Sequence, residues 1–386
     1  MSCGAESNQL ELRYIEEVTP GTAPATGNMQ ILRNTGLGGG VDKSGVQSNE
    51  IRSDRQIQDW IKTKLEPNFT VNGEFSWETW DDFFEAALFA DWATVNYDSL
   101  TNTVDADETG GVYTYALPTG HGLTLVPGAK YKFGGFTNSE NNGVKTVISQ
   151  VGDTVTVEEA LVDETSVADV TIEGSVLANG VEKHTFTFED EFTDVVKTRT
   201  RTGAAVGSLT LNLAKESVAA IVIEFLGQNV TVQDNSVVTG TPISPNSNDV
   251  MNTGDDVADI YEGGTLNALT DNLTIVIGNN LRGVNAIGST ENICVASGNF
   301  SVTGDFNAYF LDWTFYQKFL DNSASSLRFK IGDSNGDYYF NIPRIKIPTD
   351  EINAGGPNQD VIASATYQGL VDSVTGKTLI ISKISS

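Results

Sequence analysis

Short runs of Val, Ile, Thr, Phe and Tyr alternate along the chain with clusters of Gly, Asn and Asp. This alternation is typical of β-strands separated by turns, and 38 glycines in 386 residues supply many turn positions. Residues 123–174 read as a small β unit of their own, entered through Gly120 and Gly122 and left through Asn179 and Gly180. No internal repeat is visible. The pattern predicts a mainly β fold in three parts: a first part of the main domain (1–122), an inserted small β domain (123–174) and a second part of the main domain (175–386).

One segment has the period of a helix instead. Its apolar residues recur at spacings of three and four, which gives a helix one apolar face: Trp77, Trp80, Phe83, Phe84, Ala87 and Leu88. Ser76 and Thr79 are candidate N-caps, and Thr79 with Asp82 fits a short capping box. The spacing predicts a helix over 77–90 that flanks the β core, packed on the sheet or on a neighbouring subunit. A second, short helix is predicted over 313–320.

Two stretches read as long loops. Residues 36–48 contain three consecutive glycines, and a loop of this length can reach a neighbouring subunit. Residues 238–262 carry two prolines, several Asn and Asp, and few apolar side chains. Loops this long are uncommon unless they have a function, so 238–262 is predicted to be an interaction loop or an arm.

The composition limits the classes of function. The chain has 51 acidic and 23 basic residues, a net charge of −28. Affinity for DNA comes from neutralising phosphates, so this chain does not bind nucleic acid through its net field, although solubility alone can also explain acidity. Cys3 and Cys294 do not make a disulfide scaffold, and Cys294 lies in an apolar context that predicts a buried, inert thiol. The first residues do not resemble a secretory signal, and no apolar run approaches the ~20 residues that span a bilayer.

A search for catalytic and ligand-binding patterns predicts no enzyme, no cofactor and no metal site. His121 and His184 have no Cys or His neighbours, and a zinc site needs about four such ligands. The GGGVDKS segment has Asp42 where a phosphate loop needs glycine. In DSNGD the glycine comes too early for a calcium loop, and a hairpin turn explains the segment better.

Basic residues cluster twice. One group, together with an apolar neighbour, lies in the EIRSDR block: Ile51, Arg52 and Arg55. The other alternates along a predicted strand, which places its members on one face: Lys197, Arg199 and Arg201. That face is expected either to meet carboxylates of a neighbouring copy or to be a solvated strand face. A role in gripping DNA is less favoured than either.

Several segments resemble phage tail tube proteins. EIRSDR (50–55), the extended segment after it and the aromatic helix are similar to the N-terminal block of that family, which begins with EVTPGTAP (17–24) and ILRNTG (31–36). Further pieces follow in the family's order: HTFTFEDEF (184–192), GAAVGSLTLNLA (203–214), GDYYFNIPRIKI (336–347) and GKTLIIS (376–382). Residues 123–174 match least and look like an insertion.

The resemblance implies a structural virion protein with a β-sandwich-like core that forms a barrel. Six copies would join their sheets edge to edge into a ring, and rings would stack into a hollow tube that conducts DNA without binding it specifically. Implied partners are further copies of the chain, a tape-measure protein, a tail terminator and baseplate or tail-tip proteins. The implied location is the virion tail after assembly in the host cytoplasm, with no membrane.

The candidate residues for assembly or core packing follow from these patterns: Ile51, Arg52, Arg55, Trp77, Trp80, Phe83, Phe84, Lys197, Arg199 and Arg201. The alternative function is a surface-exposed β-rich binding module for a carbohydrate or a receptor. Such a module predicts an exposed aromatic platform, whereas Trp is concentrated in residues 60–92.

Overall fold

A computed structural model describes residues 4–266 and 269–386 and confirms the predicted mainly β fold. Its centre is a continuous antiparallel sheet of eight strands. From one edge to the other the order is β3 (Gly36–Gln47), β4 (Trp60–Glu74), β15 (Ala220–Leu226), β14 (Lys197–Ala214), β19 (Thr270–Gly278), β22 (Ser301–Tyr309), β25 (Val361–Gly369) and β24 (Gly336–Ala354). We call this the central sheet.

The two longest strands, β14 and β24, each leave the central sheet at their N-terminal half and pair with a second group of strands. Around β14 this group contains β13 (Phe186–Phe192), β1 (Leu10–Glu16), β2 (Gln30–Ile31) and β16 (Asn229–Gln233). Around β24 it contains β23 (Ser325–Gly332), β17 (Val257–Glu262), β18 (Thr265–Leu266) and β26 (Ile380–Ser385). Both groups pack over the central sheet and enclose the main hydrophobic core.

Helix α1 (Asp81–Leu88) lies in this core, and α2 (Thr314–Leu320) lies beside β24. The predicted helix over 77–90 is therefore shorter at both ends. Glu78 and Phe89 have left-handed backbones, with φ of 59° and 53°, and a helix cannot continue through such residues. Neither Ser76 nor Thr79 caps the helix: their hydroxyls bond to each other at 2.6 Å, and Trp80 precedes the first helical residue.

A second core lies in a smaller β unit between α1 and β13. Its strands are β5 (Ala93–Asp98), β6 (Val104–Thr109), β7 (Val112–Ala116), β8 (Lys130–Gly134), β9 (Gly143–Val151), β10 (Thr154–Val157), β11 (Glu164–Val167) and β12 (Thr171–Ala178). β5 and β12 are antiparallel neighbours in which Thr171 faces Asp98, and β12 also pairs with β26 of the main body. Because β6 and β7 contribute to this core before residue 123, we propose that the unit spans 93–178.

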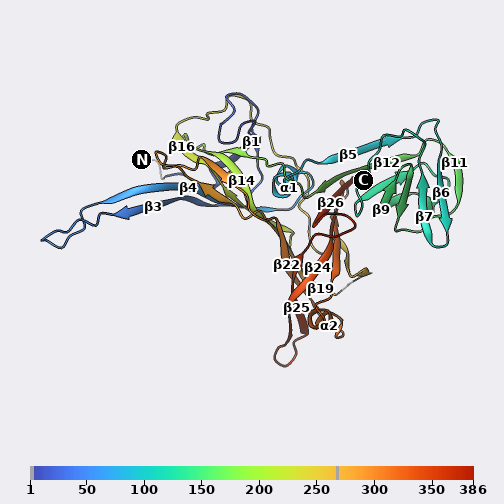
Figure 1. Ribbon diagram of the computed structural model, residues 1–386. Helices are drawn as coiled ribbons and strands as arrows, with labels where there is room; N and C mark the ends of the chain where they lie inside the picture. The colour runs from blue at the N-terminus through green and yellow to red at the C-terminus, as the bar shows by residue number, and fades with distance from the viewer. Residues whose placement is uncertain (1–3, 267–268) are drawn as a thin grey trace.

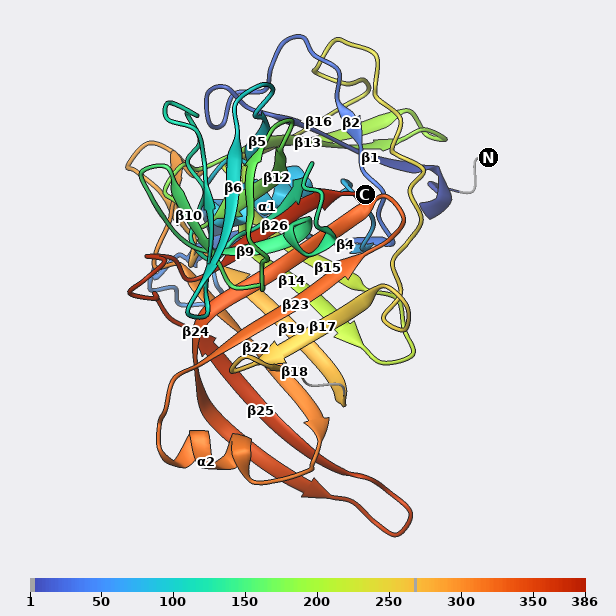
Figure 2. The same ribbon diagram turned by 90° about the vertical axis from the view of Figure 1, so that its right-hand side faces the viewer.

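The remaining short elements are a ribbon of β20 (Arg282–Val284) with β21 (Cys294–Ala296) and the 3-10 turns η1 (Ser7–Gln9) and η2 (Ser139–Asn141). Figure 1 shows three projections from the centre: the β3–β4 hairpin on one side, the small β unit on the other, and the lower end of β22, β24 and β25 beside α2. In Figure 2 the small unit covers the upper part of the body, and β24 and β25 run down past α2 to a hairpin turn at the lower right.

The loop prediction for 36–48 was wrong, and that for 238–262 was right for residues 238–256 only. Residues 36–47 form strand β3, because β4 supplies a hydrogen-bonding partner along its whole length. Residues 238–256 are irregular, but they run along the body as a strap rather than project as an arm. Single β-bridges attach this strap, joining Thr239 to Thr26 and Ile243 to Gln30. The last part of the stretch is strand β17.

Candidate assembly surfaces

The two faces of the central sheet differ in chemistry. Along its strands every second side chain is buried in the main core, whereas the positions between them carry mostly Thr, Ser and Asn. Four charged side chains are exposed at these outward positions in residues 68–74 of β4, in β15, in β22 and in residues 349–354 of β24: Glu74, Glu224, Asp305 and Glu351. All four are acidic. The outward face is therefore polar, lined by small side chains, and negatively charged.

The central sheet has two open edges. Within the described residues β3 pairs only with β4, and residues 349–354 of β24 pair only with β25. An unpaired edge presents backbone N–H and C=O groups that can bond to a strand of another chain. The two edges therefore form a complementary pair of potential contacts between copies.

The β3–β4 hairpin extends beyond the sheet as an arm whose turn spans residues 48–59. Ile51, Arg52 and Arg55 all lie in this turn. Ile51 is fully exposed, and Arg52 bonds to Asp54, which holds the pKa of the Asp54 carboxyl below its ordinary value. The arm also exposes apolar side chains to 45 % or more: Val46, Ile57, Trp60 and Ile61. An arm with this composition is suited to packing against another subunit.

The predicted aromatic residues of 77–84 are core residues. Trp77, Trp80, Phe83 and Phe84 are all buried. The ring centroid of Phe83 lies 5.3–6.0 Å from the ring centroids of Phe186, Phe188 and Phe225. These contacts connect α1 to β13 and β15. The Trp80 indole N–H donates to the carbonyl of Glu74 at 3.0 Å. These contacts lie inside one subunit, so α1 positions the sheet and is not itself an exposed contact surface.

A polar anchor holds the start of α1. Asp81 accepts hydrogen bonds from the Tyr338 hydroxyl at 2.6 Å and from Lys383 at 2.7 Å. Burial raises the pKa of Asp81 above its ordinary value, and the Lys383 ammonium and Tyr338 hydroxyl only partly offset that effect. The anchor connects α1 to β24 and β26.

The alternating basic residues of β14 do not form an exposed stripe. Arg201 and Asp190 are both 0 % exposed and are joined at 2.6 Å, and Arg199 donates to the same carboxylate at 2.7 Å. The Arg201 guanidinium also lies 4.3 Å from the centre of the Phe69 ring. Burial lowers the pKa of Arg201, although Asp190 opposes the shift. Of the three basic residues only Lys197 is largely exposed, with its ammonium paired to Asp234, so Arg201 is unavailable to a neighbour's carboxylates or to DNA.

Exposed apolar side chains surround α2. Leu311, Trp313 and Leu320 are each more than half exposed. Rings follow one another along the helix, with centroids 5.2 Å apart for Phe310 and Trp313 and 5.7 Å apart for Trp313 and Tyr316. A hollow of about 430 Å³ adjoins the helix. Such a patch is typical of a protein contact.

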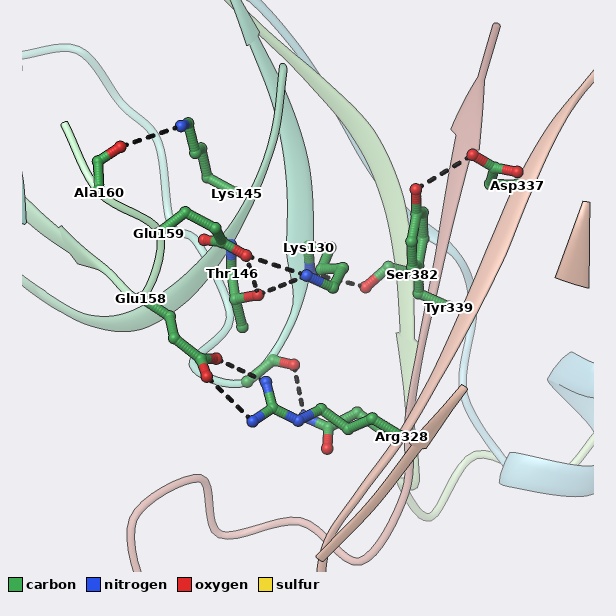
Figure 3. Close-up of polar contacts among 12 residues, drawn as sticks. Lys130, Lys145, Thr146, Glu158, Glu159, Ala160, Arg328, Asp337, Tyr339 and Ser382 are labelled. Atoms are coloured by element: carbon green, nitrogen blue, oxygen red, sulfur yellow. Dashed lines mark hydrogen bonds and ion pairs between the residues drawn. The ribbon is translucent and has the colours of Figure 1, made fainter. Parts of the chain in front are cut away.

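A cavity of about 340 Å³ lies between the small β unit and the main body, and Figure 3 shows its polar contacts. Arg328 of β23 donates to both oxygens of Glu158, and Lys130 of β8 pairs with Glu159 at 3.1 Å. Burial raises the pKa of Glu159, but the Lys130 ammonium and Thr146 outweigh it, and the pKa is lowered overall. The cations of this cavity are paired with carboxylates, and the Arg328–Glu158 pair joins the main body to the small unit, so the cavity is a polar seam that fixes the small unit.

No group of three or more His, Cys, Asp or Glu side chains with metal-binding geometry occurs in residues 4–266 and 269–386. Within the same residues, no helix is long and apolar enough to cross a membrane. The prediction of a buried Cys294 was wrong: Cys294 is exposed, because in the two-stranded β20–β21 ribbon Val295 takes the inward position.

The sequence reasoning missed the acidic face of the central sheet. Its signal was present in the alternation of apolar residues with Thr, Ser, Asn and acidic residues, as in residues 301–308 and 68–74. The open edges could not be read in this way, since pairing partners depend on the topology.

The sequence was also compared with known families and proteins. It matches the phage tail tube protein family over residues 7–369, which includes the arm, the small β unit and all eight strands of the central sheet. Comparison with individual curated proteins gave no match. A family match over nearly the whole chain agrees with the open-edged sheet and the exposed arm, and the chain belongs to the phage tail tube protein family.

Proposed function

We propose that copies of this chain join edge to edge into closed rings, and that the rings stack into the hollow tail tube through which DNA leaves the capsid. The observation that carries the proposal is the continuous antiparallel sheet with one open edge at each end. Contacts between unlike surfaces generate a closed ring when the rotation fits, and closure removes the open edges that otherwise promote aggregation. The resemblance to the family implies six tube units around each ring.

In such a ring the buried face of the central sheet points outward to its own core, and the polar face lines the channel. Each chain then presents Glu74, Glu224, Asp305 and Glu351 to the lumen. Carboxylates repel phosphate over ~8–10 Å at physiological salt, whereas Lys or Arg contacts would add a salt-dependent attraction and slow the passage of DNA. The lumen therefore conducts duplex DNA without specific binding.

Stacking of rings requires contacts along the tube axis, and the arm is the element suited to them. Its exposed Ile51 and Ile57 lie in the turn of the hairpin and Trp60 directly follows that turn, where a neighbouring ring can cover them. The family further implies a tape-measure protein inside the tube during assembly, a terminator at one end and baseplate or tail-tip proteins at the other. We place assembly in the host cytoplasm and the finished protein in the virion tail.

Electron microscopy of the purified protein tests the tube. Hollow tubes or rings are expected, and a protein that stays monomeric at high concentration would contradict the proposal. Retention of duplex DNA at about 50 mM salt, where attraction is strongest, tests the lumen. Wild-type tubes are expected not to retain DNA.

A charge reversal sharpens this second test. The triple variant Glu224→Lys, Asp305→Lys and Glu351→Lys is expected to retain DNA in a salt-sensitive way. The control makes the same charge change at three exposed acidic residues outside the central sheet: Asp107, Glu140 and Glu182. Equal DNA retention by the two variants would show that the polar face does not line the lumen.

A further inference from the structure

The strand pairings of the chain repeat. One half consists of β1, β2, β3, β4, α1, β13, β14, β15 and β16, and the other of β17, β18, β19, β22, α2, β23, β24, β25 and β26. Taken in this order, each pairing within the first half has its counterpart in the second. β1 pairs with β2 and β13 as β17 pairs with β18 and β23, and β3 pairs with β4 as β19 pairs with β22.

The long strands follow the same rule. β14 pairs with β13 and β16 through its first half and with β15 through its second, and β15 also pairs with β4. β24 pairs with β23 and β26 and then with β25, and β25 also pairs with β22. The small β unit lies between α1 and β13, and at the equivalent place in the second half α2 leads directly to β23.

The helices occupy the same place in the two halves. α1 begins seven residues after the last residue of β4, and α2 begins five residues after the last residue of β22. Each is preceded directly by a tryptophan, Trp80 or Trp313. The two halves are therefore two copies of one structural unit, each contributing four strands to the central sheet.

The junction between the halves shows how two such units join. Residues 208–214 of β14 pair antiparallel with residues 272–278 of β19, so that Asn212 faces Thr274. The strands equivalent to these two are β24 and β3. They are the two strands with open edges, because within the described residues neither has the partner that the internal junction supplies to its counterpart.

We propose that residues 349–354 of β24 in one copy pair antiparallel with residues 37–42 of β3 in the next copy, and that three copies close the ring. This inference rests on the proposed ring, and it assigns two of the six tube units to each chain. Three chains of eight strands give the same 24 strands as six chains of four. The ring therefore contains three copies rather than the six that the resemblance implies.

The internal junction also sets the register between copies. Matching β14 to β24 through β15 and β4 in one unit and through β25 and β22 in the other makes Asn353 equivalent to Asn212. Matching β19 to β3 through β22 and β4 makes Gly38 equivalent to Thr274. Asn353 is thus expected to face Gly38 of the next copy, and both lie on the outward face of the sheet. A side chain at Gly38 meets only ordinary contacts, since the nearest atoms lie 3.9 Å from the position of its Cβ.

The exposed patch around α2 is continuous with this edge. In the first unit the helix reaches the junction, where the Asn279 amide directly after β19 donates to the carbonyl of Ala87 at 3.1 Å. Trp80 is 1 % exposed, but its counterpart Trp313 is 62 % exposed. The next copy would lie beside α2 in the place that β19 takes beside α1, and would cover part of this surface.

Disulfide trapping tests the register and the copy number together. In a parent carrying Cys3→Ser and Cys294→Ser, the pair Gly38→Cys and Asn353→Cys is expected to cross-link neighbouring copies on oxidation, because opposed residues of antiparallel strands lie within disulfide range. The ladder on a non-reducing gel should end at three copies. Asn212→Cys with Thr274→Cys is the matched control, and it should cross-link within one chain.

The mass of the wild-type ring gives an independent measurement that needs no variant. Three copies of the 41.4 kDa chain weigh about 124 kDa, and six weigh about 248 kDa. A ring of 248 kDa, or a ladder that continues to six, would overturn the three-copy ring and leave the tube intact. Tubes whose cysteines do not cross-link would overturn the edge pairing. A wild-type protein that forms neither rings nor tubes would overturn the proposed function and this inference with it.

Discussion

The Asp190→Ala variant tests the buried ion cluster of β13 and β14. Asp190 holds Arg201 and Arg199, and the Nε and Nη2 atoms of Arg201 have no hydrogen-bond partner in the described chain. Removing the carboxylate leaves a buried guanidinium without a counter-charge, whereas Arg199 is partly exposed and can turn to water. Breaking a buried pair in this way costs about 3–5 kcal/mol of the free energy of unfolding.

Urea unfolding followed by tryptophan fluorescence measures this loss directly. A domain of this length loses about 0.8 kcal/mol per degree near its melting temperature, so Tm is expected to fall by about 4–6 °C. Lys197→Ala is the matched control: it breaks an ion pair of the same strand whose side chains are 61 % and 70 % exposed. Exposed pairs contribute about 0–1 kcal/mol.

A double variant separates the charge from the packing. Asp190→Leu with Arg201→Met replaces the pair by apolar side chains and is expected to recover most of the stability, because an apolar replacement removes the unpaired charge. If Asp190→Ala costs no more than Lys197→Ala, the carboxylate is not buried against Arg201. The buried ion pair between Asp190 and Arg201 would then be refuted.

Three further outcomes follow from the contacts described. Trp80→Ala should lower the free energy of unfolding in urea by about 3–5 kcal/mol, as truncations of large buried side chains do. The exposed Trp313→Ala should change it little in the isolated subunit. Equal effects of the two variants would contradict the different burial of the two helices. Burial raises the pKa of Asp350, so the folded protein favours the neutral acid. The free energy of unfolding of the protein should therefore increase as pH falls through the raised pKa. Asp350→Asn should remove that increase in urea titrations at several pH values. Deleting 99–170 and joining β5 to β12 by an Asn-Gly turn should leave ring formation intact in sedimentation, and a folded product that forms no rings would place the small unit in the assembly contact.

Local patterns were sufficient for elements whose partners lie nearby or follow from periodicity. The spacing of Trp80, Phe83 and Phe84 predicted α1, because one apolar face requires that period. Its ends were not predictable, since the left-handed backbone at Glu78 accompanies a hydrogen bond from the Glu78 N–H to the hydroxyl of Tyr338, 260 residues away.

The pattern of charged residues predicted less of the structure than the apolar period did. The alternation of Arg199 and Arg201 placed them correctly on one strand, and both contact Asp190. Whether that face meets water depends on what covers it, and the cover here comes from β4 and β13. Likewise the glycines of 36–48 favour a loop locally, yet β4 draws them into a strand.

The sequence by itself therefore determined the β class, the helices, the acidic character and the family, because composition and apolar period are local properties. The tertiary structure alone decided the duplicated unit and the open edges. Strands pair through backbone hydrogen bonds, and their register requires only that apolar side chains alternate with polar ones on each strand. Two halves with different side chains can therefore keep the same strand pairing. For that reason no repeat is visible along the chain, although the topology repeats strand by strand.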